Sequence, residues 1–416
     1  MIPTAISACR CCGNTVLEPI LSLGIQHLTG VFPRSVRDTV TSGPLELVKC
    51  FGSEACGLVQ LRHTYDSAEM YGGNYGYRSG LNQTMVRHLG RTAATVLAKY
   101  PCHDGALVLD IGSNDGTLLS FMPASAQRVG MDPTIAKYGE YYDPGISAVP
   151  EFFSAARFHE LHGERRAEII TSIAMFYDLD DPLAFVRDIA AVLAPTGVWY
   201  FEQSYLPTML AQNAYDTICH EHLEYYALRQ IQWMMTRCGL RVIDAGLNDI
   251  NGGSFSVAVC REEASYAPNT EAIDALMSLE RSAKLDTMEP YQAFAARVAS
   301  HREQLRATLS GIRSSGASIL GYGASTKGNV ILQYCGLSTT EIPAMAEVNA
   351  DKFGAYTPGT NIPIISETEA PARKPDYFLV MPWHFRENLI QREAAFLKRG
   401  GKLIFPLPEI SVVESS

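Results

Sequence analysis

Residues 107–119 read Leu-Val-Leu-Asp-Ile-Gly-Ser-Asn-Asp-Gly-Thr-Leu-Leu, and residues 129–132 read Val-Gly-Met-Asp. The first stretch predicts a buried strand, a glycine turn and the start of a helix. The second predicts a neighbouring strand that ends in an acid. In α/β folds such an acid, placed after the second strand, accepts hydrogen bonds from a ribose. The sequence therefore predicts an α/β domain that binds a nucleoside-type ligand.

The charges of this glycine loop favour S-adenosylmethionine over a dinucleotide. A pyrophosphate requires Gly-x-Gly-x-x-Gly, because bare backbone amides must face the phosphates at a helix N-terminus. This loop instead carries acceptor side chains, which repel a phosphate but hold a sulfonium or an amino group. The acid at the end of the second strand can accept both ribose hydroxyls. We expect the cofactor to contact Asp110, Gly112, Ser113, Asn114, Asp115, Gly116 and Asp132.

The composition excludes several classes of function. The chain has 416 residues, 47% of them hydrophobic and 19% charged, which is typical of a globular protein with about three domains. A formal net charge of -10 argues against a nucleic-acid partner, because a phosphate backbone needs a basic surface. No apolar stretch has the length of a membrane span, and the N-terminus lacks a signal-peptide pattern. We expect a cytoplasmic protein that acts on a small molecule.

The N-terminal region contains a cysteine cluster that predicts a structural zinc site. Four thiolates satisfy tetrahedral Zn(II), and a short segment with few apolar runs gains stability from such a cross-link. The predicted ligands are Cys9, Cys12, Cys50 and Cys56. Cys11 is an alternative ligand, and the alternative interpretation is that the cysteines are reduced and simply pack. Four sulfur ligands leave no open position, so a catalytic zinc is not expected.

Strand-like and helix-like segments alternate after the cofactor loop, as in a doubly wound parallel sheet. A polar stretch at 262–270 is the best candidate for a linker. Beyond two long helical patterns, a second glycine-rich unit begins at Ser318. The predicted fold class is α/β, with a small N-terminal zinc-binding domain followed by two Rossmann-like doubly wound domains. The predicted boundaries are 1–80, 81–262 and 263–416.

The second glycine loop, Gly321-Tyr-Gly-Ala-Ser-Thr-Lys-Gly-Asn329, has hydrogen-bond donors and no acid. It therefore suits a phosphate, where the first loop does not. The turn Asn251-Gly-Gly-Ser254 lets the backbone approach a ligand closely. Residues expected to bind a phosphorylated or diphosphate-linked substrate are Asn251, Gly253, Ser254, Gly321, Gly323, Ser325, Lys327, Asn329 and Glu347. A structural turn is the alternative interpretation of this loop.

The run Asp216-Thr-Ile-Cys-His-Glu-His-Leu-Glu224 is the densest group of ionisable side chains in the chain. A histidine near its ordinary pKa is a natural base for a weakly acidic proton, and an adjacent carboxylate can orient its ring. The pair His220 and His222 lacks the spacing of hydrolytic zinc sites. A methyl donor needs such a base when the acceptor is carbon, because carbon beside a carbonyl must first lose a proton to form an enolate.

Six motifs, in this order, resemble the sugar C-3'-methyltransferases of branched deoxysugar biosynthesis, and the resemblance spans essentially the whole chain. These motifs are Cys9-Arg-Cys-Cys-Gly, Cys56-Gly-Leu-Val-Gln-Leu, the loop at Asp110, His220-Glu-His, Asn251-Gly-Gly-Ser and the loop at Gly321. The resemblance implies methylation of carbon 3 of a nucleotide-linked 4-keto-6-deoxy sugar, with S-adenosylmethionine as donor. It implies that His222 is the base, with Glu221 beside it, and that Tyr75 or Tyr77 lies near the substrate. The C-terminal glycine loop would meet the nucleotide diphosphate.

Two positions depart from the amino-sugar members of this family. Cys219 stands where they have a tyrosine, and Asp178 stands where they have a histidine. Both positions could touch the sugar, so we expect a hydroxyl rather than an amino group at carbon 3. Alternative functions are an O- or N-methyltransferase, a zinc-dependent interaction module on a degenerate scaffold, and an oxidoreductase that uses the Gly321 loop. The oligomeric state is not predicted.

Overall fold

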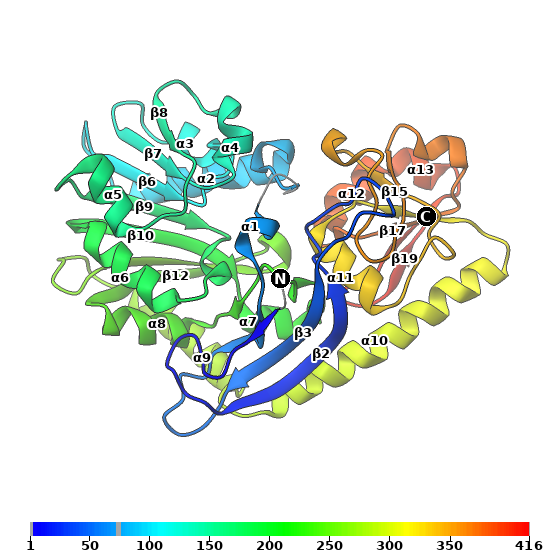
Figure 1. Cartoon of the computed structure of the whole chain (residues 1–416), viewed down its shortest axis with the longest axis horizontal. Coiled ribbons are helices and arrows are strands. Elements are labelled where there is room, and N and C mark those ends of the chain that lie inside the picture. Colours follow the sequence, from blue (N-terminus) through cyan, green and yellow to red (C-terminus); the bar gives the residue numbers. More distant parts are fainter. Residues whose placement is uncertain (1–2, 72–75, 416) are drawn as a thin grey trace.

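A computed structural model describes residues 3–71 and 76–415 of the chain. It contains the two predicted α/β units, which lie side by side, and a long N-terminal hairpin runs from the first unit toward the second (Figure 1). Within the described residues, no helix combines the length and the apolarity that crossing a bilayer requires.

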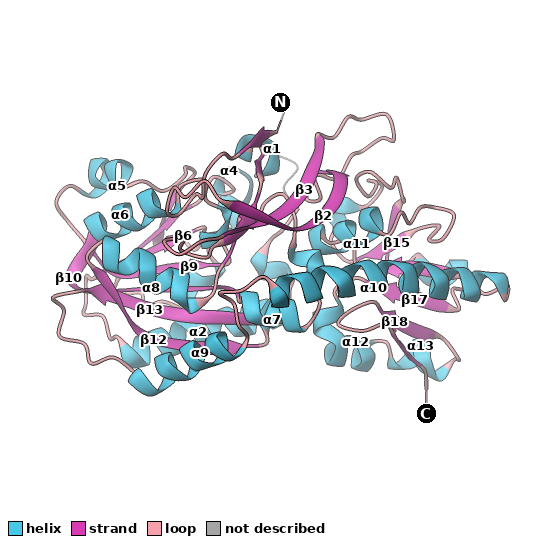
Figure 2. Cartoon of the chain, turned by 90° about the horizontal axis from the view of Figure 1, so that it is seen from below, coloured by secondary structure: helices cyan, strands magenta, loops and turns pink. Residues whose placement is uncertain are grey.

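The N-terminal region forms a four-stranded antiparallel sheet in the order β11-β4-β3-β2 and a small pair, β1 with β5. Alternate side chains of β3 and β4 pack in one core with the helices of the second α/β unit. The end of the N-terminal region that carries Cys9, Cys50 and Cys56 packs in the core of the first unit. Figure 2 shows β2 and β3 crossing above helix α10. The elements are β1 (Thr4–Ala5), β2 (Leu17–His27), β3 (Ser42–Cys50), β4 (Val59–Leu61), β5 (His63–Thr64), β11 (Glu224–Tyr225) and α1 (Ser67–Met70).

The first α/β unit is built on a seven-stranded sheet in the order β12-β13-β10-β9-β6-β7-β8. All five residues of β6 are buried, because a parallel strand is covered on both faces. The strands are β6 (Leu107–Ile111), β7 (Gln127–Met131), β8 (Ile146–Val149), β9 (Ala167–Ile173), β10 (Leu193–Ser204), β12 (Leu240–Asn248) and β13 (Ser254–Arg261). The predicted doubly wound parallel sheet is present, and one of its strands, β13, runs antiparallel to β10 and β12. The short connection from β12 to β13 can only form a hairpin, which requires antiparallel strands.

Local signals explain where several helices of this unit begin. The side chain of Asn82 caps α2, and the side chain of Asp181 caps α6 ahead of a proline in the first turn. The buried face of α2 includes Met85, Leu89 and Val96, which recur at helical spacing. The helices are α2 (Gln83–Lys99), α3 (Thr117–Ser120), α4 (Ile135–Tyr138), α5 (Ala155–His162), α6 (Pro182–Val192), α7 (Leu206–Ala211), α8 (Leu228–Arg237) and α9 (Thr270–Ser282).

Helix α9 lies in the range predicted for the C-terminal domain, but it packs on β12 of the first unit. Its residues Ile273 and Leu276 belong to the core of that unit. Glu280 fixes the helix there, because one carboxylate oxygen accepts hydrogen bonds from the Tyr205 hydroxyl at 2.8 Å and the Leu228 amide at 2.6 Å. The long helix α10 (Glu289–Ser314) then carries the chain into the second unit.

The second α/β unit has a six-stranded sheet in the order β16-β15-β14-β17-β18-β19, of which only β19 is antiparallel to its neighbour. This is the strand order of a dinucleotide-binding fold. The strands are β14 (Ile319–Tyr322), β15 (Met345–Glu347), β16 (Ile364–Ser366), β17 (Tyr377–Val380), β18 (Lys402–Phe405) and β19 (Ser411–Val413). The helices that follow α10 are α11 (Thr326–Tyr334), α12 (Arg386–Arg392) and α13 (Ala394–Lys398).

Candidate active site

One cavity of about 480 Å³ is lined by residues of both α/β units and of the N-terminal region. This volume is in the range of small-molecule sites. The predicted site residues that line it are Tyr77, Asp110, Gly112, Ser113, Asn114, Asp132, Glu221, His222, Asn251, Ser325 and Lys327. Tyr75 lies outside the described residues. The other predicted binding and catalytic residues are not among the residues that line this cavity.

The first glycine loop has the backbone that its sequence requires. Gly112 has a φ of 71°, and a Cβ there would lie 2.9 Å from the Cγ of Met175, so a larger residue is excluded on two grounds. The next turn places the backbone amide of Asn114 2.8 Å from Oδ2 of Asp132. The other oxygen of Asp132 accepts from the amide of Thr134 at 2.6 Å. This carboxylate is therefore held rigidly at the cavity wall with lone pairs left for a ligand.

Two residues of the loop brace it instead of facing the cavity. Asp115 accepts hydrogen bonds from the Gly80 amide at 2.8 Å and from the Thr117 hydroxyl at 2.6 Å. Gly116 adopts a left-handed conformation at the start of α3. These contacts join the loop to the segment 77–80, in which Tyr77 is half-exposed and lines the cavity. Asp115 and Gly116 thus support the site without lining it.

Asp110, the penultimate residue of β6, lines the floor of the cavity and is 3% exposed. Burial raises the pKa of Asp110 to about 7, although a hydrogen bond from Thr171 at 2.6 Å opposes the shift. Glu202, near the carboxyl end of β10, lines the same cavity. It pairs with His88 at 2.7 Å and accepts from Asn248 at 2.8 Å. The cofactor side of the cavity is therefore acidic, as a ligand with a positive charge requires.

His222 lies at the junction of the two units, and its ring packs on Tyr177 with centroids 4.3 Å apart. Its Nδ1 lies 2.9 Å from the carbonyl oxygen of Thr217. A carbonyl only accepts, so Nδ1 carries the proton and Nε2 has the free lone pair of a base. Burial lowers the pKa of His222 to about 3, and the positive charge of Lys327 is the second largest cause of this shift. The imidazole is therefore neutral at physiological pH.

The ring of His222 is thus oriented by a backbone carbonyl, where we expected an adjacent carboxylate. Glu221 instead points to the N-terminal region, where its Oε2 accepts a hydrogen bond from Thr29 at 3.4 Å. A Cβ on Gly30 would lie 2.3 Å from its Oε1, so a larger residue there would displace this carboxyl group. Burial raises the pKa of Glu221 and of Asp178, which also lines the cavity. Two carboxyl groups therefore stand in the cavity near His222.

His220 does not face the cavity. It is 0% exposed, its ring meets Tyr65 edge-on with centroids 4.5 Å apart, and it faces the backbone of Gln26 and Gly43 in the hairpin. Residues 220 and 221 form a turn, which directs this ring into the core. Cys219 is also fully buried and does not line the cavity, contrary to our expectation that it could touch the sugar.

The second glycine loop contributes some of its predicted residues to the cavity. Ser325 lines it and caps α11 through a hydrogen bond from the Gly328 amide at 3.0 Å. Lys327 lines it and donates to the Asn251 carbonyl at 2.8 Å. Gly321 and Gly323 are required for packing, because a Cβ would lie 1.9 Å from Met345 and 2.7 Å from Pro382, respectively.

Four other predicted substrate-binding residues hold the loops in place. Asn329 donates to the Thr29 carbonyl at 2.7 Å, which joins α11 to the N-terminal region. Glu347 accepts from the amides of Ala324, Val348 and Asn349 at 2.7 to 2.9 Å. Gly253 packs on Thr208, and Ser254 donates to the Ile250 carbonyl at 3.0 Å. Glu347 thus accepts a hydrogen bond from a backbone amide of the second glycine loop, as Asp132 does from the first loop.

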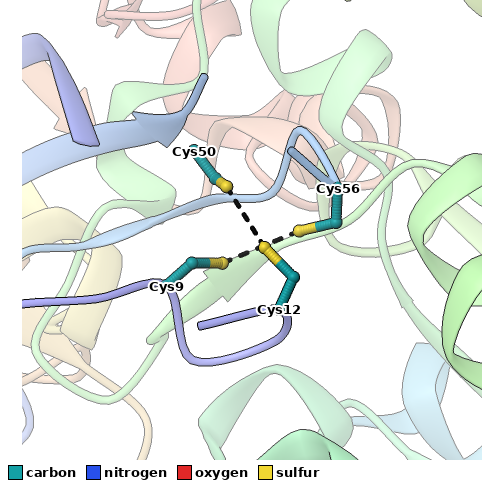
Figure 3. A group of neighbouring side chains, drawn as sticks. All are labelled: Cys9, Cys12, Cys50 and Cys56. Atoms are coloured by element: carbon teal, nitrogen blue, oxygen red, sulfur yellow. Dashed lines mark hydrogen bonds between the residues drawn. The ribbon is translucent and has the colours of Figure 1, made fainter. Parts of the chain in front are cut away.

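The four predicted zinc ligands converge at the other end of the N-terminal region (Figure 3). The sulfur atoms of Cys9, Cys12, Cys50 and Cys56 all lie within 4.8 Å of one another. Zinc-sulfur bonds of about 2.3 Å in a tetrahedron place the sulfur atoms about 3.8 Å apart, so this donor set fits Zn(II). Cys11 is buried beside the cluster but is not part of it, so the alternative ligand is not needed.

Comparisons with known proteins decide the family. The chain is 32% identical to the C-methyltransferase NovU of Streptomyces niveus over an alignment of 416 residues, which covers 99% of this chain and 97% of the relative. The chain belongs to the C-methyltransferase family. Residues 249–408 match the family described as C-methyltransferase C-terminal domain, residues 85–245 match a methyltransferase domain, and residues 9–71 match a zinc binding domain.

Solved structures resemble this C-methyltransferase only in part. The mitomycin 7-O-methyltransferase MmcR is 17% identical, with a TM-score of 0.34, and the match covers 44% of this chain and 55% of that one. The magnesium protoporphyrin IX methyltransferase of Synechocystis, with bound S-adenosylmethionine, is 12% identical, with a TM-score of 0.32 and coverages of 42% and 79%. The assignment rests on the family matches above.

The family confirms the predicted cofactors, S-adenosylmethionine and structural zinc. The cavity fits the methyl donor, because it joins the buried carboxylate of Asp132, a glycine loop without phosphate-binding chemistry and an acidic floor. The C-methyltransferase family also sets aside an oxidoreductase and an O- or N-methyltransferase as alternatives.

Several residues that line the cavity were not predicted from the sequence. Glu202 lies near the carboxyl end of β10, whereas Lys352 and His384 follow β15 and β17, and all three line the cavity. Ligands of α/β folds bind at the carboxyl ends of the parallel strands. That rule, applied to each predicted strand end, is the signal that could have found these three residues.

Proposed function

We propose that this C-methyltransferase methylates carbon 3 of a nucleotide-diphosphate 4-keto-6-deoxy sugar, with His222 as the base. The observation that carries the proposal is the hydrogen bond from Nδ1 of His222 to the Thr217 carbonyl, which leaves Nε2 as a free acceptor in the cavity. A neutral imidazole so fixed can remove the proton beside a ketone. When bound, S-adenosylmethionine supplies an electrophilic methyl group, whose bond to sulfur breaks with its electron pair left on sulfur.

The shape of the cavity supports a substrate with both a sugar and a diphosphate. Its cofactor side is acidic, whereas another part is lined by Ser325 and Thr326 at the start of α11 and by Lys352, which donates to the Ala324 carbonyl just before that helix. Backbone amides at a helix start and a lysine suit the diphosphate. The sugar would then lie between the two ends, beside Glu221, His222 and Tyr77. The sugar, the position of methylation and the base are our proposal, and they rest on this arrangement of charges.

The test uses purified protein, S-adenosylmethionine and a panel of 4-keto sugar nucleotides, with mass spectrometry and NMR of the products. A ketone at carbon 4 makes the hydrogens at both carbon 3 and carbon 5 acidic, so the methylated carbon must be located directly. We expect methylation at carbon 3 and exchange of the hydrogen there with D2O. Methylation at carbon 5 would refute the position but not the base.

The variant His222→Gln tests the base, and His220→Gln is its matched control. We expect the first to lower kcat and the exchange rate by roughly 10² to 10⁴-fold while binding of the methyl donor, measured by calorimetry, is retained. The control should change the rate little, because its ring lies in the core. Full exchange activity in His222→Gln would refute the proposed base.

The same panel tests the group at carbon 3. Asp178 lines the cavity where amino-sugar enzymes have a histidine, so we keep the hypothesis that the substrate has a hydroxyl at carbon 3. Turnover of a 3-amino substrate but not of its 3-hydroxy counterpart would reverse it.

A further inference from the structure

Lys327 belongs to the second α/β unit, but its side chain lines the cavity that contains the proposed base, His222. Its Nζ donates to the Asn251 carbonyl at 2.8 Å, across the junction between the two units. This bond uses one of the three N–H donors of the ammonium group. The side chain lines the same cavity as His222, and its positive charge acts on that imidazole. A cation with spare donors therefore stands beside the proposed base.

The ionisable neighbours of Lys327 all belong to this centre. Its charge acts on Asp216, His222 and His384, and Cys219 acts on it in turn. Asp216 is fully buried, with one oxygen bound to the Trp383 indole at 2.7 Å, while its other oxygen has no hydrogen-bond partner within the described chain. The negative charge of this aspartate favours the charged form of Lys327.

One short turn positions both the base and the cation. Asp216 and Thr217 are neighbours in η4 (Tyr215–Thr217). This turn packs on α11, which carries Lys327, and the carbonyl of Thr217 fixes the ring of His222. The ammonium and the imidazole therefore have a fixed relation to one another, as a pair that acts on adjacent atoms of one substrate requires.

A second lysine of the cavity has different surroundings. Lys352 donates to the Ala324 carbonyl at 2.8 Å and lies over the Phe32 ring at 4.5 Å, next to the loop that leads into α11. It lies beside the start of α11, where backbone amides suit a phosphate. The two lysines therefore serve different parts of a substrate, although the sequence predicted a role in binding the phosphorylated substrate for Lys327 alone.

We propose that Lys327 is a catalytic residue that donates a hydrogen bond to the C-4 oxygen of the sugar as negative charge develops there. The inference rests on the proposed function. His222 takes the proton from carbon 3, and the electron pair of that C–H bond forms a C-3 to C-4 double bond. The π pair of the ketone moves to oxygen, opposite the ammonium group. The pair then returns as carbon 3 forms its new bond to the methyl group, and the proton leaves His222 to solvent.

The test compares Lys327→Met with Lys352→Met in the full-length protein that contains zinc. Substrate hydrogen exchange in D2O is measured with bound S-adenosylhomocysteine, and kcat and KM are measured with the methyl donor. We expect Lys327→Met to lower kcat and the exchange rate by roughly 10² to 10³-fold. Lys352→Met should mainly raise KM. Calorimetry of the methyl donor shows that each variant is folded, and Lys327→Arg, which keeps the charge, should recover part of kcat.

A pH profile gives a second readout. Removing the charge of Lys327 should raise the pKa of His222, so the acidic limb of the kcat/KM profile should move to higher pH in Lys327→Met. Asp216, Cys219 and His384 are the other titratable groups that share the surroundings of Lys327. If Lys327→Met raises KM alone, with exchange and the acidic limb unchanged, the lysine binds phosphate and the inference is wrong. If instead His222→Gln exchanges the substrate hydrogen at the wild-type rate, His222 is not the base, and the proposed function itself is refuted.

Discussion

Replacing His220 with glutamine should make the protein less sensitive to acid. The ring is 0% exposed, and burial lowers the pKa of His220 to about 3 in the folded state. In the unfolded chain a histidine has a pKa of about 6.5. The depressed pKa means that the folded state binds fewer protons, so the stability is present above the unfolded pKa and falls as the pH drops from about 6.5 toward 3.

The size of the effect follows from the two pKa values. Between pH 7 and pH 5, proton uptake by this one histidine stabilises the unfolded state by about 2 kcal/mol, and the folded state gains almost nothing. Glutamine does not titrate. The free energy of unfolding of the wild-type protein should therefore fall by about 2 kcal/mol more than that of His220→Gln over this range. The comparison cancels the titration of all other groups.

The assay is urea denaturation of both proteins at pH 7 and pH 5, followed by tryptophan fluorescence. Methyl transfer is measured on the same samples at pH 7, where the variant should retain its rate. Parallel pH dependences of unfolding in the two proteins would refute the buried, neutral state of His220. Loss of methyl transfer from a folded variant would refute its place outside the active site.

Other perturbations test the cofactor sites. Cys12→Ser should lose the bound zinc and unfold at a lower temperature, whereas Cys11→Ser should keep it; elemental analysis distinguishes the two, and equal zinc contents would contradict the ligand set. Gly112→Ala and Gly105→Ala both introduce a side chain at a left-handed position, at a cost of about 1 to 2 kcal/mol. Only the first should also weaken S-adenosylmethionine binding in calorimetry, because a Cβ at Gly105 meets no atom within 4 Å. Asp132→Asn should raise the Kd for S-adenosylmethionine about tenfold or more, because charge-assisted hydrogen bonds are lost; an unchanged Kd would exclude this carboxylate from the site.

The family and the fold class could be predicted from the sequence because their signals are local. A buried strand that enters a glycine turn requires a left-handed backbone at Gly112, and only glycine adopts it cheaply. The two cysteine pairs, which have few apolar neighbours, are also a local signal. They predict a metal site because the residue type itself determines that a thiolate can bind a metal. The direction of β13 could have been predicted too, from the shortness of the loop before it.

The sequence could not separate the residues that face the cavity from those that hold it in place. His220 and His222 carry the same chemical signal, and only the turn at 220–221 sends one ring into the core and the other into the cavity. Glu347 and Asp132 likewise follow equivalent strands, but only Asp132 lines the cavity.

What the sequence by itself determined is the set of local elements: the two glycine loops, the cysteine ligands and the chemistry that each can perform. The tertiary structure decided which of these groups meet. Lys327 lies 105 residues from His222 along the chain, and the two line one cavity only because α11 packs against the N-terminal hairpin at the junction of the units. Burial at that junction then sets the charge of the imidazole, because desolvation depends on neighbours that are remote in sequence.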